Sequence, residues 1–167
     1  MDLVDSFASW AWARHHNILS WYIRPLFLLP YCYFAFRRSY SGLLLTIVAL
    51  LSSMFWFPEP TNVHPTVVAA LEAERQYLLG PWPLWKVALS LFVPLTLAAL
   101  AFAFWRRSWL WGIVVVNAIA ASKVAWTVFV FDTGGFLAHL APALVGLFVC
   151  NLVLVPLYWR YGRATTR

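Results

Sequence analysis

Five long apolar segments decide what this chain can fold into. They cover residues 18–36, 41–57, 84–105, 109–131 and 136–159. A helix needs about 20 largely apolar residues to cross a bilayer, and each segment meets or approaches that length. Only 11% of the residues are charged, against about 25% in soluble domains. We therefore predict an all-α integral membrane protein, with residues 1–167 forming a single polytopic domain of five transmembrane helices.

The charged residues divide between the two sets of connecting segments, which predicts an orientation. Seven arginines follow the first, third and fifth apolar segments: Arg37, Arg38, Arg106, Arg107, Arg160, Arg163 and Arg167. All six acidic residues fall on the opposite set: Asp2, Asp5, Glu59, Glu72, Glu74 and Asp132. Short loops rich in Lys and Arg stay in the cytoplasm. We expect the N-terminus outside and the C-terminus inside, in the inner (plasma) membrane of a bacterium.

The net charge of +6 does not indicate a nucleic-acid partner. The basic residues come as isolated pairs between apolar runs, whereas a nucleic-acid-binding domain carries a basic stripe or a recognition motif. The expected partners are the lipid bilayer itself, an anionic small molecule or lipid headgroup, and either a second copy of the chain or another membrane protein.

Two further helices are expected on the outer side. Residues 3–12 are apolar and aromatic but too short to span a membrane, which predicts a short interfacial helix. Residues 66–79 follow a His-Pro-Thr start and precede a Gly-Pro stop. Their apolar side chains Val67, Val68, Leu71 and Leu78 share one face, so this amphipathic helix should lie on the membrane surface or close the outer mouth of the bundle.

The sequence contains a possible internal repeat. Pro25 precedes Arg37 by twelve residues, and Pro94 precedes Arg106 by the same distance, with Arg-Ser following in both cases. We predict a hairpin repeat over 18–57 and 84–131, followed by a fifth helix over 136–159. The alternative is a chance likeness between apolar segments, which is common. Duplicated halves with a site at their interface are a recurrent transporter design.

Lys123 is the most conspicuous polar residue. An ionisable side chain near the membrane centre costs about 2.5–3.5 kcal/mol on insertion scales and is by default a functional candidate. Lys123 lies about 12 Å below the outer end of its helix, and Asp132 is about 13.5 Å further along the same helix and half a turn away. Its partner must come from another helix, a ligand or the ring of Trp126. The alternative is that Lys123 reaches the interface along its own stem.

Three other polar residues complete the candidate ligand-binding set with Lys123 and Trp126. Arg24 precedes Pro25 about 9 Å below the outer end of the first segment. Asn117 and Asn151 sit deep in the fourth and fifth segments, where amides commonly bond to a neighbouring helix. Because no acid lies in the membrane core, we expect a small carrier, channel or ligand-binding protein with an interior site for an anionic or lipid-like molecule.

Two other classes of function remain open at this stage. Asp132, His139 and either His15 or His16 could form an outer-face enzyme or metal site, although no His-Glu-x-x-His or other ligand motif supports it. No catalytic motif such as Gly-x-Ser-x-Gly is present and the sequence identifies no cofactor. The third possibility is a non-catalytic accessory subunit or scaffold of a membrane complex.

Overall fold

The computed structural model describes residues 3–130 and 133–162, and this part of the chain is helical almost throughout and contains no strand. The all-helical prediction is confirmed. The elements are α1 (Leu3–His15), α2 (Leu19–Ile23), the 3-10 helix η1 (Arg24–Phe27), α3 (Leu28–Phe36), α4 (Tyr40–Ser52), the 3-10 helix η2 (Ser53–Phe55), α5 (Pro65–Leu79), α6 (Leu84–Trp105), α7 (Trp109–Val130), α8 (Thr133–Leu157) and the π-helix η3 (Tyr158–Gly162).

Three of the five predicted spans are long and apolar enough to cross a membrane. They are Leu84–Trp105, Trp109–Phe129 and Ala138–Gly162. The segment predicted over 41–57 forms a shorter apolar helix over Tyr40–Phe55. The segment predicted over 18–36 is helical but divided into α2, η1 and α3. The chain is thus a helical protein with three candidate membrane spans.

Pro25 explains the division of the first segment. Proline has no N–H and its ring disturbs the preceding turn, so an α-helix is interrupted there; here the chain forms the 3-10 helix η1. This helix packs tightly on α8 because residue 146 is a glycine. A Cβ atom at Gly146 would lie 2.1 Å from the Pro25 Cβ. The Cys150 thiol, one turn along α8, donates to the Pro25 carbonyl (3.7 Å). The contacts at Gly146 and Cys150 therefore fix the position of η1 along α8.

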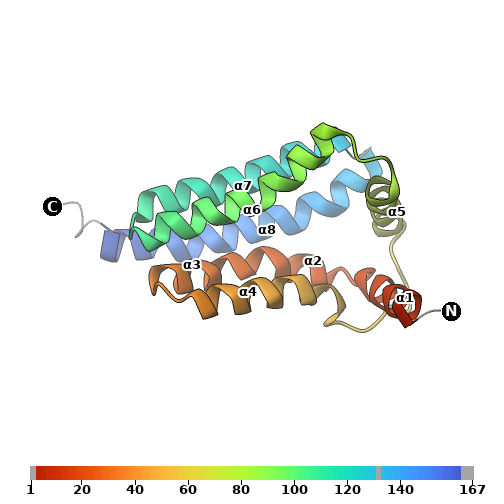
Figure 1. The fold of residues 1–167 in the computed structure, drawn as a ribbon, viewed down its shortest axis with the longest axis horizontal. Helices are drawn as coiled ribbons and strands as arrows, with labels where there is room; N and C mark the ends of the chain where they lie inside the picture. The colour runs from red at the N-terminus through yellow and green to blue at the C-terminus, as the bar shows by residue number, and fades with distance from the viewer. Residues whose placement is uncertain (1–2, 131–132, 163–167) are drawn as a thin grey trace.

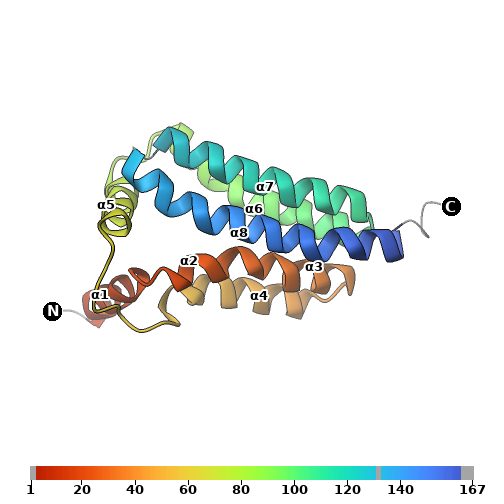
Figure 2. The same cartoon turned by 180° about the vertical axis from the view of Figure 1, so that it is seen from behind.

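The long helices run side by side and α1 and α5 cross one end of the bundle (Figure 1). The two ends of the chain lie at opposite ends of the molecule. Seen from behind, α8 lies between α7 and the α2–η1–α3 segment (Figure 2), which agrees with its contacts to α7, α2 and η1. At the end where α3 and α6 finish, these two helices pack on one another.

Two separate cores hold the helices together. One joins α3, α6, α7 and α8 at the end of the bundle that carries the turns after α3 and α6, which we call the arginine-rich end. It consists of Tyr31, Cys32, Ala35, Leu100, Phe104, Val116, Cys150 and Leu154. The other lies beneath α5 and consists of Trp21, Val67, Ala70, Leu71 and Ala138. The second core corrects the predicted face of the 66–79 helix: Val67 and Leu71 are buried, but Val68 and Leu78 are exposed because the helix touches the bundle along a narrow stripe.

The hairpins α3–α4 and α6–α7 turn in the same way. Arg38 and Arg107 adopt the left-handed conformation (φ 56° and 57°), which usually favours glycine after a helix. The next residue donates a backbone hydrogen bond to the fifth residue before it in both turns, from Ser39 to Phe34 and from Ser108 to Ala103, each at 2.9 Å. Both turns are therefore Schellman motifs that end on an Arg-Ser pair.

The two turns also hold one another. The Arg38 guanidinium donates to the carbonyl oxygen of Trp105 (3.3 Å), and the Arg107 guanidinium lies over the ring of Phe36 (5.4 Å). Arg38 and Arg107 are 69 residues apart, as are Phe36 and Trp105. Two ring contacts also join the hairpins at equivalent positions, 69 residues apart: Tyr40 packs on Trp105 (4.7 Å) and Trp109 packs on Phe36 (5.3 Å). A duplicated hairpin predicts such exchanged contacts; common descent of the two halves stays a prediction.

Candidate functional site

A cavity of about 690 Å³ lies between the two cores, within the range of about 300–1,000 Å³ that is usual for ligand sites. Most of its walls are aliphatic and aromatic side chains from α3, α4, α6, α7 and α8. Its polar lining residues are Arg24, Tyr77, Ser90, Thr96, Ser122 and Lys123. The hydroxyls of Ser90 and Thr96 are bonded to carbonyls of their own helix.

Three of the five predicted ligand-binding residues meet in this cavity. Lys123 and Trp126 reach it from α7, and Arg24 reaches it from η1. Lys123 belongs to a candidate membrane span, and its side chain is exposed where it borders the open cavity. Trp126 packs edge-on against Tyr77 of α5 (ring centroids 5.4 Å), so α5 closes the cavity at the end where the two cations lie.

Asn117 and Asn151 are placed elsewhere. Each amide donates to the other's side-chain oxygen (3.1 and 3.2 Å), which joins α7 to α8. Each also donates to a carbonyl of its own helix, that of Ile113 or Leu147. Neither asparagine belongs to the residues that line the cavity. In this arrangement the pair satisfies itself and fixes the register of the two helices.

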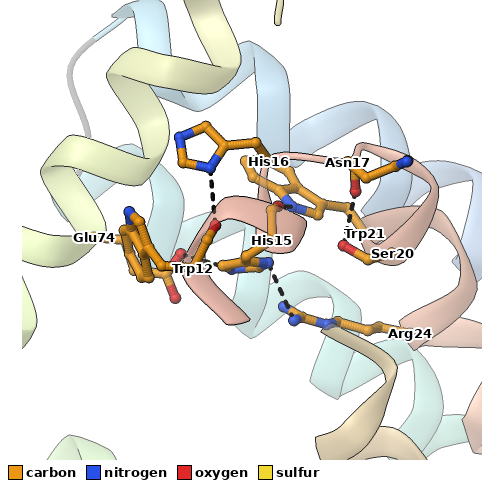
Figure 3. Close-up of polar contacts among 8 residues, drawn as sticks. All are labelled: Trp12, His15, His16, Asn17, Ser20, Trp21, Arg24 and Glu74. Carbon is orange, nitrogen blue, oxygen red and sulfur yellow. Dashed lines mark hydrogen bonds and ion pairs between the residues drawn. The ribbon is translucent and has the colours of Figure 1, made fainter. Parts of the chain in front are cut away.

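Arg24 also belongs to a polar network that includes His15 and Glu74, which Figure 3 shows. Its Nη2 atom lies 3.4 Å from Nδ1 of His15, at the end of α1. The other ring nitrogen of His15, Nε2, lies 3.6 Å from Oε2 of Glu74 on α5. The indole N–H of Trp21 donates to the His15 carbonyl (3.0 Å). His15 is only 3% exposed, so this network joins α1, η1 and α5 inside the protein.

The predicted outer-face metal site gains no support from the described residues. His15 and His139 lie against the same indole, that of Trp21: His15 at 5.9 Å and His139 stacked at 4.7 Å. His16 lies away from His15 and donates to the Trp12 carbonyl (2.9 Å; Figure 3). Within 3–130 and 133–162, no three His, Cys, Asp or Glu side chains are close enough to hold a metal ion. The fourth candidate, Asp132, lies outside the described residues.

Glu74 is a site residue that the sequence reasoning missed. It follows Val67, Ala70 and Leu71 at helical spacing, on the stripe of α5 that faces the bundle. Burial raises the pKa of its carboxyl, but the interactions with His15, His139 and Lys123 outweigh burial and hold that pKa below its ordinary value. Glu74 is therefore a carboxylate at neutral pH, and its negative charge interacts with Lys123.

Lys86 was also missed, and its position is structural. It is 2% exposed, and its ammonium group donates to the carbonyls of Tyr77, Gly80 and Pro81 at the end of α5. It also lies over the rings of Tyr77 (4.3 Å) and Trp82 (4.4 Å). A cation at a helix C-terminus complements the helix dipole. Lys86 thereby holds α5 to the start of α6 and keeps Tyr77 at the cavity.

The structure is that of a helical protein with candidate membrane spans. We call its cavity, which Arg24 and Lys123 line, the cationic chamber. Two cations, Arg24 and Lys123, face a space whose described lining contains no carboxylate, and one carboxylate, Glu74, lies behind them against His15. Such a chamber can hold an anionic group at one end and apolar groups along its walls. Comparison with protein-family profiles, with curated proteins and with solved structures gives no match to this chain.

Proposed function

We propose that this protein binds an amphiphilic anion in the chamber and carries it within or across the membrane. Lys123 and Arg24 bind the anionic headgroup, and the aliphatic and aromatic walls bind the tail. The observation that carries the proposal is the pairing of two cations with an apolar cavity of about 690 Å³. The ligand class is a carboxylate, phosphate or similar headgroup with a hydrocarbon body.

The charge balance of the chamber supports an anionic ligand. Arg24 and Lys123 bring two positive charges, and Glu74 brings one negative charge that it shares with His15. Among the residues that the structure describes, one positive charge is left without compensation. An unpaired cation in a membrane interior is costly, at about 2.5–3.5 kcal/mol on insertion scales. A bound anion removes that cost, which an uncharged or cationic ligand does not.

The position of the cavity supports a ligand that arrives from the lipid. Several of its lining residues, among them Leu89, Phe92, Val93 and Phe129, are also exposed on the side of the bundle. The chamber therefore opens towards the hydrocarbon region rather than only towards water. It also lies between the two hairpins of the predicted repeat, and ligand sites between repeats are typical of carriers.

The proposal includes five spans and an orientation. We take α2–η1–α3 and α4 as two further spans, because they run lengthwise along the bundle, as α6, α7 and α8 do (Figure 1). The described arginines at the α3–α4 and α6–α7 turns and Arg160 lie at one end, and the acids of α1 and α5 lie at the other. Short basic connections stay inside, which puts the arginine-rich end in the cytoplasm of a bacterial cell and the chamber near the outer surface.

A binding experiment tests the proposal. Octanesulfonate, which has a permanent anionic headgroup and a short tail, is titrated by calorimetry into the protein in phosphatidylcholine nanodiscs, with empty nanodiscs as the blank. Binding is expected for octanesulfonate but not for methanesulfonate or octanol, which lack the tail or the charge. Lys123→Met should weaken binding about tenfold or more, since a charge-assisted hydrogen bond contributes about 1.5–3 kcal/mol.

Arg106→Met is the matched control. It removes one positive charge from the exposed turn at the opposite end of the bundle and should leave octanesulfonate binding unchanged. If Lys123→Met binds octanesulfonate as well as the wild type, the proposal is wrong at its main residue and the accessory-subunit alternative gains support. Mass spectrometry of organic extracts of the purified protein then distinguishes the two natural sources of the ligand, a phospholipid or a free fatty acid. Efflux of the bound amphiphile from proteoliposomes distinguishes a carrier from a binding protein.

A further inference from the structure

The contact between Arg24 and His15 fixes where the ring proton of His15 lies. A guanidinium group has N–H donors and no acceptor. The His15 Nδ1 atom, 3.4 Å from Arg24 Nη2, must therefore offer its lone pair. In the neutral ring the proton is then on Nε2, the nitrogen that faces the Glu74 carboxylate at 3.6 Å. His15 thus links a cation to an anion.

A second proton on His15 can go only to Nδ1, the atom that accepts from Arg24. Two N–H groups and two positive charges would then face one another, and Arg24 would lose its acceptor. Because Arg24 also lines the chamber, its guanidinium would turn towards that space and towards Lys123. The imidazolium of His15 would remain paired with Glu74. The polar network beside the chamber would then carry one more positive charge, on His15, and the released guanidinium would be free to bind an anion.

We infer that the protein takes up one proton at His15 Nδ1 with each anion that it binds, so that proton and anion enter together. The inference rests on the proposed function. In the proton balance, the imidazole lone pair bonds the incoming proton, the Arg24–His15 hydrogen bond is lost, no covalent bond breaks, and the proton's charge is matched by the charge of the bound anion. A carrier of this kind would move the anion together with a proton.

The surroundings of His15 favour it as the proton acceptor. Burial raises the pKa of Glu74, but His15, His139 and Lys123 outweigh burial and hold it below its ordinary value, so this carboxyl is ionised at neutral pH. The His139 ring is stacked on the Trp21 indole, with the ring centroids 4.7 Å apart. It is the other imidazole that could take up the proton in place of His15. The groups that face or electrostatically contact His15 are Trp12 of its own helix, Trp21 of α2, Arg24 of η1, Glu74 of α5 and His139 of α8, with Lys123 of α7 coupled through Glu74.

The test measures octanesulfonate affinity against pH. The sulfonate stays ionised between about pH 5 and 8, the range in which imidazole changes charge in proteins, so any pH dependence belongs to the protein. The affinity of the wild type in phosphatidylcholine nanodiscs should rise by up to about tenfold per unit fall in pH, the limit for one linked proton. Calorimetry in two buffers of different ionisation enthalpy should count close to one proton taken up per octanesulfonate.

Variants locate the proton. His15→Gln should bind octanesulfonate with an affinity that does not change with pH, and Arg24→Gln should flatten the pH dependence as well as weaken binding. His16→Gln, on the same helix but bonded only to the Trp12 carbonyl, and His139→Gln should both keep the wild-type pH dependence.

The outcomes separate this inference from the proposed function. Wild-type binding that does not change with pH, with no proton taken up, overturns the proton coupling and leaves the anion site standing. Binding whose pH dependence survives His15→Gln, or disappears in His139→Gln, overturns the assignment to His15. Absence of octanesulfonate binding at every pH overturns both proposals. If His15→Gln does not fold, the proton count of the wild type together with His139→Gln still decides the question.

Discussion

Replacing Gly146 by alanine adds one methyl group where α8 supports η1. The new Cβ would lie 2.1 Å from the Pro25 Cβ and 2.8 Å from its Cγ. Carbon atoms in contact are normally about 3.5–4.0 Å apart, so η1 must move away from α8 by roughly 1.5 Å. Overpacking of this kind costs about 1–3 kcal/mol. We expect Gly146→Ala to lower the free energy of unfolding by that amount.

The same displacement should weaken anion binding. Arg24 directly precedes Pro25, so the movement of η1 carries the guanidinium away from its place beside the chamber. Loss of one charge-assisted hydrogen bond corresponds to about a tenfold or greater loss of octanesulfonate affinity. Unfolding can be followed by the reaction of a fluorescent maleimide with Cys32 and Cys150, because these thiols are only 2% and 1% exposed in the folded protein.

Gly112→Ala is the matched control for this prediction. Its added Cβ would lie 2.4 Å from the Phe104 ring, in the core at the arginine-rich end. A comparable loss of stability is expected, but octanesulfonate affinity should stay as in the wild type. The reasoning about packing is refuted if Gly146→Ala unfolds at the same temperature as the wild type. The reasoning about Arg24 is refuted if Gly146→Ala is destabilised and still binds octanesulfonate normally.

Three further predictions follow from the polar residues. Asn117→Ala and Asn151→Ala should each lower stability, with a coupling of about 0.6–2 kcal/mol in a double-mutant cycle and unchanged octanesulfonate affinity; a coupling near zero would contradict the amide pair. Lys86→Met should destabilise the protein by about 1–3 kcal/mol because three carbonyls lose their donor, and proteolysis of native protein should then cut at the end of α5; equal protease resistance would contradict the capping role. The lowered pKa of Glu74 contributes stability above the ordinary carboxyl pKa of about 4.3, and this contribution disappears as the pH falls through the folded-state value. The difference in unfolding free energy between wild type and Glu74→Gln should therefore shrink on acidification below about pH 4, and a difference that is constant with pH would contradict the interaction with His15.

Much of the fold could be predicted from the sequence because the membrane imposes long apolar helices. The helix over Pro65–Leu79 and the placement of Arg24, Lys123 and Trp126 around one space follow from residue spacing and from the cost of burying charge. Helical spacing states which face of one helix a residue occupies. Spacing does not state which helix packs against that face. The partners of Glu74, Lys86, Asn117 and Asn151 depend on this packing.

Glu74 shows this limit most clearly. Its spacing from Val67, Ala70 and Leu71 is compatible with the buried stripe of α5, but the sequence names no partner for its charge. Only the packing of α5 on α8, which leaves Glu74 beside His15 of α1, shows that partner. Lys86 depends likewise on how residues 80–83 turn the chain, because that turn brings its ammonium group to the carbonyls of Tyr77, Gly80 and Pro81. The amides of Asn117 and Asn151 were candidates for a ligand until the register of α7 against α8 placed them opposite one another.

The exchanged contacts between the two Arg-Arg-Ser turns have a consequence for how such a protein can be assembled. Arg38 binds Trp105 while Arg107 covers Phe36, so each hairpin gives the other the contact that it receives. In an oligomer this would be an isologous interface, the self-complementary kind that joins identical subunits about a two-fold axis. A single hairpin with this turn is therefore complementary to a second copy of itself in the same membrane orientation. It needs no differently shaped partner.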